Sequence, residues 1–186
     1  MPNFYSININ GFRRSDGVLL YDWNPVVINQ IIEVDTSGTG AASAWTRTAQ
    51  QGDVFFIFCK RGEGCESSEN GPLPISLKTR GIYAIAKSVS NPYPYRTGRT
   101  AIRVRIIALL ENHVSQLEIN INPITYWATP YRGNRNDAIQ RHPDETNERF
   151  APHPQQGLEF VKMILAKNSG LRNTLINEWP YFKNKV

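Results

Sequence analysis

The sequence predicts a single α+β domain, in which a mostly antiparallel sheet is curled into a barrel and helices pack on its outside. Short apolar or alternating runs bounded by turn residues are typical of strands, and the C-terminal part shows a helical apolar period. The chain has 186 residues, enough for one hydrophobic core, and neither a repeat nor a linker divides it. We therefore expect one domain spanning residues 1–186.

Four segments have the pattern of strands, and they comprise residues 4–9, 54–59, 81–90 and 101–110. The first, FYSINI, alternates and ends at the turn signal Asn-Gly, whereas the second, VFFIFC, is almost continuously apolar. In the third we expect Ile82, Ala84 and Ala86 on one face, and Tyr83 and Ile85 on the other. In the fourth, apolar residues alternate with arginines.

Three segments are expected to be helical. Asn24-Pro25 is typical of a helix start, and the apolar residues of 26–32 then predict a short helix. Residues 157–167 place their apolar side chains on one helical face, and Gly170 follows the predicted end. Residues 171–179 predict a further short helix that Pro180 stops.

Two long polar segments separate these elements. Residues 60–80 form a Pro- and Gly-containing loop, and residues 129–156 form an irregular stretch rich in Arg, Asn and Pro. Loops of about twenty residues are uncommon in a compact domain unless they are functional or mobile. The basic start of the first loop, Lys60-Arg61-Gly62, is either an ordinary hairpin tip or the rim of a binding site.

The composition is that of a folded, water-soluble protein, with 40% hydrophobic and 20% charged residues. The formal net charge of +5 fits a polyanionic partner, although many proteins without such a partner share it. No secretion signal and no apolar run near the roughly 18 residues of a membrane span occurs, so the default location is cytoplasmic. The spacing of Cys59 and Cys65 does not fit a CxxC site.

Catalytic motifs are poorly supported. The sequence contains no GxSxG elbow and no phosphate-binding glycine loop, and its three histidines do not combine with the cysteines at a zinc-like spacing. The acidic string that contains His142, Asp144 and Glu145 leaves a small hydrolase or metal-dependent nuclease open as an alternative. Such a site needs carboxylates at a strand end beside a lysine, and a solvated loop explains the string better. We expect no cofactor and no bound metal.

Aromatic and basic residues are interleaved in the remaining sequence. Most tryptophans belong to cores, but Trp45 follows a loop of small residues and precedes the polar segment Thr46-Arg47-Thr48. Base faces stack on aromatic rings for about 1–3 kcal/mol each, while Arg and Lys hold phosphates. This combination favours a nucleic-acid partner.

Three segments in a fixed order carry a family resemblance: AWTRT (44–48), QQGDVFFIFCKRG (50–62) and RGIYAIAKSVSNPYPY (80–95). Together they resemble the EVE branch of the PUA-like superfamily, which is related to YTH domains. The resemblance is clearest over about residues 20–110. Within this branch, the sequence most resembles the amino-terminal modified-DNA reader domains of McrBC-type, modification-dependent restriction proteins.

The resemblance implies a PUA-like barrel that binds DNA, or RNA, without catalysis and flips a modified base into an aromatic pocket. Trp45 would be one wall of the pocket, Phe56, Tyr93 and Trp127 are candidates for the second, and Ser43 and Thr46 would read the base edge. The nucleic-acid backbone would be held by basic residues, namely Arg47, Lys60, Arg61, Arg96 and Arg99.

The resemblance further implies a fused or separate motor or nuclease as partner. A PUA-like module that binds protein or a small ligand remains the other alternative. The identity of the modified base stays open at this point.

Overall fold

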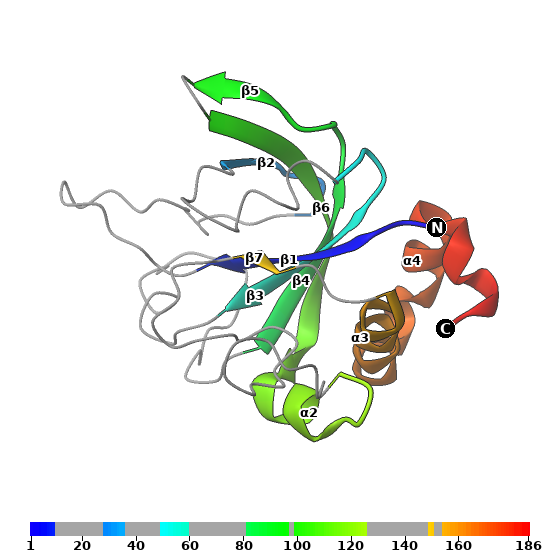
Figure 1. Cartoon of the computed structure of the whole chain (residues 1–186). Helices are drawn as coiled ribbons and strands as arrows, with labels where there is room; N and C mark the ends of the chain where they lie inside the picture. The colour runs from blue at the N-terminus through cyan, green and yellow to red at the C-terminus, as the bar shows by residue number, and fades with distance from the viewer. Residues whose placement is uncertain (10–27, 36–48, 60–80, 97–98, 126–148, 151–153) are drawn as a thin grey trace.

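The computed structural model describes residues 1–9, 28–35, 49–59, 81–96, 99–125, 149–150 and 154–186. Within these residues the chain forms one seven-stranded sheet with the order β2-β6-β4-β3-β1-β7, and β5 pairs with β6 beside this path (Figure 1). The strands are β1 (Phe4–Ile9), β2 (Ile31–Asp35), β3 (Val54–Cys59), β4 (Gly81–Ser88), β5 (Tyr93–Arg96), β6 (Arg99–Ser115) and β7 (Arg149–Phe150).

The sheet confirms the predicted α+β class and its mostly antiparallel character. Only the β1–β3 pair is parallel among the described strand pairs. The sheet is strongly curled in Figure 1, but its terminal strands β2 and β7 are not paired with each other in the described residues. The expected barrel is therefore curled and open there.

The predicted helix over residues 26–32 is wrong in its described part, since Ile31–Asp35 is a strand that pairs with β6. Asn29 adopts a left-handed backbone (φ 70°) and turns the chain into this strand. Its N–H donates to the Ile106 carbonyl at 2.8 Å, and the Ile106 N–H donates back to Gln30 at 2.9 Å. Pairing with β6 and the strand preference of β-branched residues outweigh the helix-start signal.

The expected alternation of strand β4 is also wrong. The β4–β6 register shifts between Ile82 and Ala84 and again between Ile85 and Ala86. Such bulges turn successive side chains out of strict alternation. As a result Ile82 and Ile85 pack on one face of the sheet, while Tyr83, Ala84 and Ala86 pack on the other.

Each face of the sheet has its own apolar cluster. We call the face that meets the helices the helix face; its cluster includes Phe4, Phe56, Ile85, Phe160 and Phe182. The opposite face carries a second cluster, which includes Tyr5, Ala49, Phe55, Tyr83, Ile102, Val104 and Ile106. A sheet with two buried faces explains why VFFIFC is apolar without alternation.

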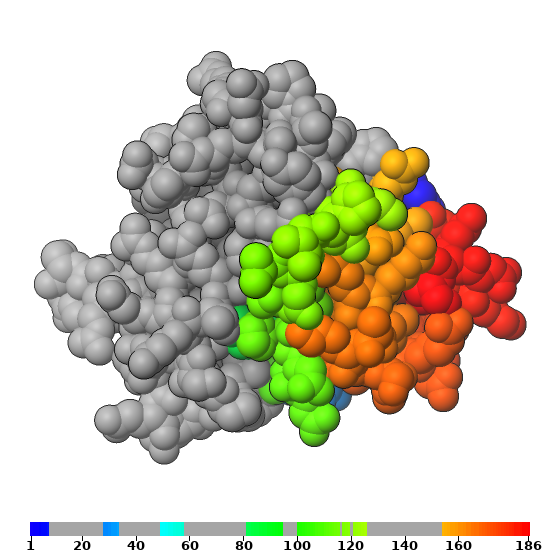
Figure 2. Space-filling view, turned by 90° about the horizontal axis from the view of Figure 1, so that it is seen from below, coloured from blue at the N-terminus to red at the C-terminus, as the bar shows by residue number. Residues whose placement is uncertain are grey.

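The described helices lie on one side of the sheet (Figure 1). They are α2 (Gln116–Ile121), α3 (Pro154–Lys167) and α4 (Arg172–Glu178), with short 3-10 turns at Ser169–Leu171 and Pro180–Asn184. Figure 2 shows α2, α3 and the C-terminal residues packed side by side. Helices α3 and α4 confirm the two predicted C-terminal helices, with shifted ends. None of the helices in the described part is long and apolar enough to cross a membrane.

An ion pair joins α2 to α3. The Glu118 carboxylate accepts hydrogen bonds from the Ser115 N–H at 2.8 Å and from Lys167 Nζ at 2.7 Å. Partial burial opposes the charge of Glu118, but Lys167 and Ser115 outweigh it and lower its pKa to about 2. The charged form is therefore favoured in the folded protein.

We expect a pH-dependent loss of stability from this group. Because its pKa is lowered on folding, Glu118 stabilises the fold above pH 4.5, and this contribution disappears as the pH falls towards about 2. The side chain is 38% exposed, so solvent screening limits the effect to about 1 kcal/mol. Thermal unfolding of the wild type and of Glu118→Gln between pH 5 and pH 2 checks it. The difference in stability between them should shrink on acidification, and a constant difference would contradict the assignment.

Candidate nucleic-acid interface

The Gly52-Asp53 pair forms a turn directly before β3. Gly52 has a φ of +98°, which glycine adopts without strain, and Asp53 is buried. The Asp53 carboxylate accepts the Asn3 N–H at 2.8 Å and the Gln50 N–H at 2.7 Å, while the Asp53 N–H donates to Ser88 Oγ at 2.8 Å. The turn is thereby fixed to the start of β1 and the end of β4.

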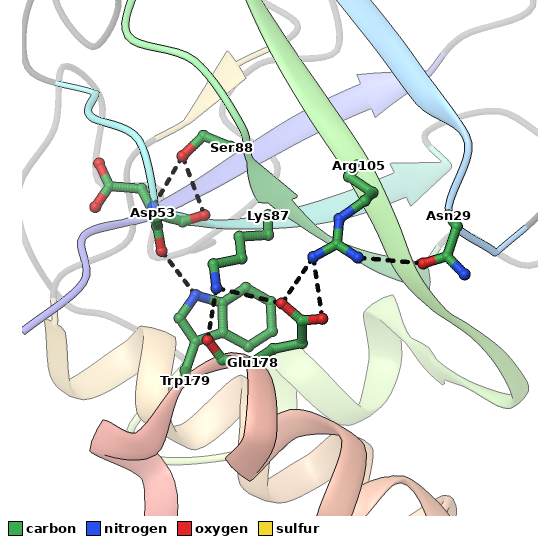
Figure 3. A network of polar contacts seen from close by, with 8 residues as sticks. Asn29, Asp53, Lys87, Ser88, Arg105, Glu178 and Trp179 are labelled. Carbon is green, nitrogen blue, oxygen red and sulfur yellow. Dashed lines mark hydrogen bonds and ion pairs between the residues drawn. The ribbon is translucent and has the colours of Figure 1, made fainter.

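The C-terminal segment holds this turn from the helix side (Figure 3). The indole Nε1–H of Trp179 donates to the Gly52 carbonyl at 2.7 Å, and Trp179 is only 3% exposed. The Lys87 ammonium lies 5.6 Å from the centre of the Trp179 ring. Its Nζ also contacts Glu178, at 2.7 Å from the carbonyl oxygen and 3.2 Å from a carboxylate oxygen.

Glu178 links two basic residues of neighbouring strands. Arg105 Nη2 lies 3.0 Å and 2.9 Å from the two carboxylate oxygens of Glu178, and Arg105 Nη1 lies 3.2 Å from Asn29 Oδ1 (Figure 3). Lys87 and Arg105 are cross-strand partners in the β4–β6 register. One carboxylate thus neutralises part of the charge of two basic side chains and binds α4 to the sheet.

Tyr93, a candidate pocket wall, is already engaged by neighbours on β2 and β6. Its hydroxyl hydrogen-bonds Glu33, and the Arg103 guanidinium lies 5.2 Å from the centre of its ring. Partial burial and the Glu33 carboxylate raise the pKa of Tyr93, so its hydroxyl stays protonated and donates. Tyr93 pairs with Ala101, which shares a face with Arg103 and Arg105, so its ring lies on the side of the sheet that carries the helices.

Phe56, another candidate wall, is fully buried on the helix face. Its ring stacks with Phe4 at a centroid distance of 6.1 Å and meets the edge of Phe160 at 5.3 Å. Its exposed fraction is 0%, so a flipped base could reach it only if core neighbours moved. In this arrangement Phe56 has a core role that its aromatic character alone did not reveal.

The strand register brings some of the predicted contacts to one end of the sheet. The segment 36–48 leaves β2 at Asp35 and re-enters the described chain at Ala49, and both anchors lie at the Ser88 end of β4 in the register. Arg96 and Arg99 pair with each other across the β5–β6 hairpin. This hairpin extends past the Ser88 end of β4. Ala49 is buried in the cluster on the face opposite the helices.

Lys60 and Arg61 directly follow Cys59, which pairs with Gly81 at the other end of β3. The six residues of β3 separate this end from the Gly52-Asp53 turn by about 20 Å. The Cys59 end of β3 is therefore at the opposite end of the sheet from the β5–β6 hairpin.

The other predicted site residues lie outside the described part of the chain. These are the pocket residues Ser43, Trp45, Thr46 and Trp127, the backbone contacts Arg47, Lys60 and Arg61, and the hydrolase candidates His142, Asp144 and Glu145. Among the described residues, no group of three His, Cys, Asp or Glu could hold a metal ion.

Sequence reasoning missed the hydrogen bond from Trp179 to the Gly52 turn and the ion pairs of Glu178 with Lys87 and Arg105. Trp179 and Gly52 are 127 residues apart, so no local pattern could link them. The single available signal was an amphipathic C-terminal segment that ends in a Glu-Trp-Pro sequence.

No family model and no curated protein sequence matches the chain. Solved structures do share its fold. A hypothetical protein from Leishmania major matches with a TM-score of 0.58 at 10% identity, covering 90% of this chain and 98% of that one. A protein from Pseudomonas syringae matches with a TM-score of 0.52 at 12% identity, over 87% and 99% of the two chains.

Human THYN1, solved in complex with DNA containing 5-methylcytosine, also shares the fold. It matches with a TM-score of 0.52 at 12% identity, covering 89% of this chain and 97% of that chain. At such identities the likeness establishes a common fold.

Proposed function

We propose that this chain is a PUA-like reader domain that binds duplex DNA carrying a methylated base, and that it acts by binding without catalysing a reaction. The shared fold with human THYN1, whose structure contains 5-methylcytosine DNA, supports this proposal. In our proposal the modified base leaves the stack and enters an aromatic pocket of which Trp45 is one wall.

The observation that carries the proposal is the anchoring of the segment that contains Trp45. Both ends of this segment, Asp35 and Ala49, belong to the end of the sheet where the basic β5–β6 hairpin lies. Trp45 precedes Ala49 by four residues, and four residues of fully extended chain span at most about 14 Å. This supports a proposed site in which a stacking ring and phosphate-binding arginines would act together.

The positions of the candidate walls favour Trp127 as the partner of Trp45. Phe56 and Tyr93 both lie on the side of the sheet that carries the helices, whereas Ala49 joins the opposite face. We therefore propose Trp127 as the second wall, with Ser43 and Thr46 reading the base edge. Arg47, Arg96 and Arg99 would hold the backbone beside the flipped base, and Lys60 and Arg61 would contact the duplex farther away.

Discrimination of a methylated base needs more than burial of the methyl group. One methyl group contributes only about 1–3 kcal/mol of specificity in an apolar pocket, so fitted aromatic walls and hydrogen bonds must add to it. Flipping costs a few kcal/mol, which phosphate contacts offset. We further propose that the domain supplies specificity to a motor or nuclease, fused or separate, in a modification-dependent restriction system.

We expect binding to duplexes with one modified base to exceed binding to the plain duplex by about tenfold or more. A titration panel with methylated and hydroxymethylated bases, in DNA and in RNA, at two salt concentrations tests this. Affinity for every duplex should fall with salt, because the phosphate contacts release counterions.

Two outcomes of this panel would contradict the reader function. Absence of salt-dependent binding to any nucleic acid would favour a module for protein or small ligands. Divalent-metal-dependent cleavage that Asp144→Ala abolishes would favour a nuclease instead.

A further inference from the structure

The Gly52-Asp53 turn follows Trp45 closely in the sequence, after residues 49–51. Two independent sets of contacts fix the position of this turn. From within the sheet, Asp53 binds Asn3, Gln50 and Ser88, as described above. From the helix side, Trp179 donates its single side-chain hydrogen bond to the Gly52 carbonyl at 2.7 Å. The second support comes from the far end of the chain.

The geometry around Trp179 restricts its position closely. Its ring packs against Phe182 at a centroid distance of 5.7 Å, and Lys87 lies over its face at 5.6 Å. Glu178, the preceding residue, holds both Lys87 and Arg105 and thereby fixes the end of α4 against β4 and β6. The indole is thus aimed at Gly52 by packing, a cation–π contact and an ion-pair network together.

The Trp179 side chain contributes more than apolar packing. The Phe4, Phe56, Phe160 and Phe182 cluster fills the helix face with apolar rings, and a phenylalanine at position 179 could join it. The indole nitrogen adds one directed bond, and its acceptor is a residue of the turn from which the chain runs back towards Trp45.

We propose that Trp179 is a positioning residue for the proposed reader site: by holding the Gly52 carbonyl, the C-terminal segment fixes the turn that joins Ala49 to β3. This inference rests on the proposed reader function. It assigns base discrimination in part to a residue that never contacts DNA, since Trp179 is buried against the sheet on the helix side. Loss of the bond loosens the turn while the phosphate contacts persist.

The test compares Trp179→Phe with Val114→Ala. Trp179→Phe removes the N–H donor and keeps an aromatic ring, whereas Val114→Ala weakens the same apolar cluster beside Ile82, at the opposite end of β4 from the turn. For Trp179→Phe we expect the ratio of modified-duplex to plain-duplex affinity to fall by roughly 2- to 10-fold, the effect of one hydrogen bond, with unchanged affinity for plain duplex. Val114→Ala should lower the unfolding temperature and leave the ratio unchanged.

A second measurement does not depend on DNA. Amide hydrogen exchange at Gly52 and Asp53 should become faster in Trp179→Phe, whereas exchange at Ala84 in the middle of β4 should stay as in the wild type. Unchanged exchange at the turn, or an equal loss of the affinity ratio in Val114→Ala, would overturn the proposal. If the wild type prefers no modified duplex, the reader function fails and the pocket role of Trp179 fails with it, while faster exchange still shows that Trp179 holds the turn.

Discussion

Replacement of Trp45 by alanine is expected to remove most of the preference for modified over plain duplex. A base stacked on an aromatic ring gains about 1–3 kcal/mol, so affinity for the modified duplex should fall by roughly 5- to 150-fold. Affinity for the plain duplex should change little, because it depends on phosphate contacts from Arg and Lys. Anisotropy titrations with both duplexes at two salt concentrations measure the effect, and circular dichroism checks the fold.

Three further variants make this result specific. Trp45→Phe keeps a smaller stacking surface and should retain part of the preference. Trp127→Ala should resemble Trp45→Ala, since we propose it as the second wall. Tyr93→Ala is the matched aromatic control, because the Tyr93 ring is held by Glu33 and Arg103 on the side of the sheet that carries the helices. Survival of the full preference in Trp45→Ala would refute the pocket assignment.

Much of the fold was accessible from the sequence because its strands are bounded by strong local signals. FYSINI, VFFIFC and the run from Gly81 are strands as predicted, and α3 begins and ends within three residues of expectation. The failures have a common cause in pairing between distant residues. Residues 31–35 form a strand because β6 pairs with them, and β4 changes face because its register with β6 contains bulges. Neither interaction can be recognised from the local sequence.

The candidate site was accessible only in part. The role of Gly52-Asp53 could be predicted, since Gly-Asp before an apolar run is a turn signal, and the buried Asp53 carboxylate explains why this turn is rigid. Phe56 could not be separated from a pocket residue by its type, because core and stacking roles both select aromatic rings. The contribution of Trp179 required the tertiary structure, which places the last helix against the start of β3.

Substitution of Gly157 by alanine is expected to destabilise the fold more than a typical surface substitution. A Cβ atom at this position would lie 2.1 Å from Cγ of Phe4, well inside van der Waals contact. The Phe4 ring cannot easily move, because it is 2% exposed and stacks with Phe56 at 6.1 Å and with Phe182 at 6.3 Å.

Alanine favours a helix over glycine by about 0.5–1 kcal/mol, but overpacking of a core typically costs about 1–3 kcal/mol. The steric clash with Phe4 should therefore outweigh the helix preference of alanine at position 157. The unfolding temperature should fall by several degrees for a chain of this size.

Gly170→Ala supplies the matched control for this substitution. A Cβ atom at Gly170 would meet nothing within 4 Å, so its effect should stay within about 0.5 kcal/mol. A double-mutant cycle with Phe4→Leu identifies the clashing partner. The shorter leucine leaves room above residue 157, so the double variant should be more stable than the sum of the single effects predicts, by about 1 kcal/mol. Wild-type stability of Gly157→Ala, or strict additivity with Phe4→Leu, would show that α3 does not pack on β1 through this contact.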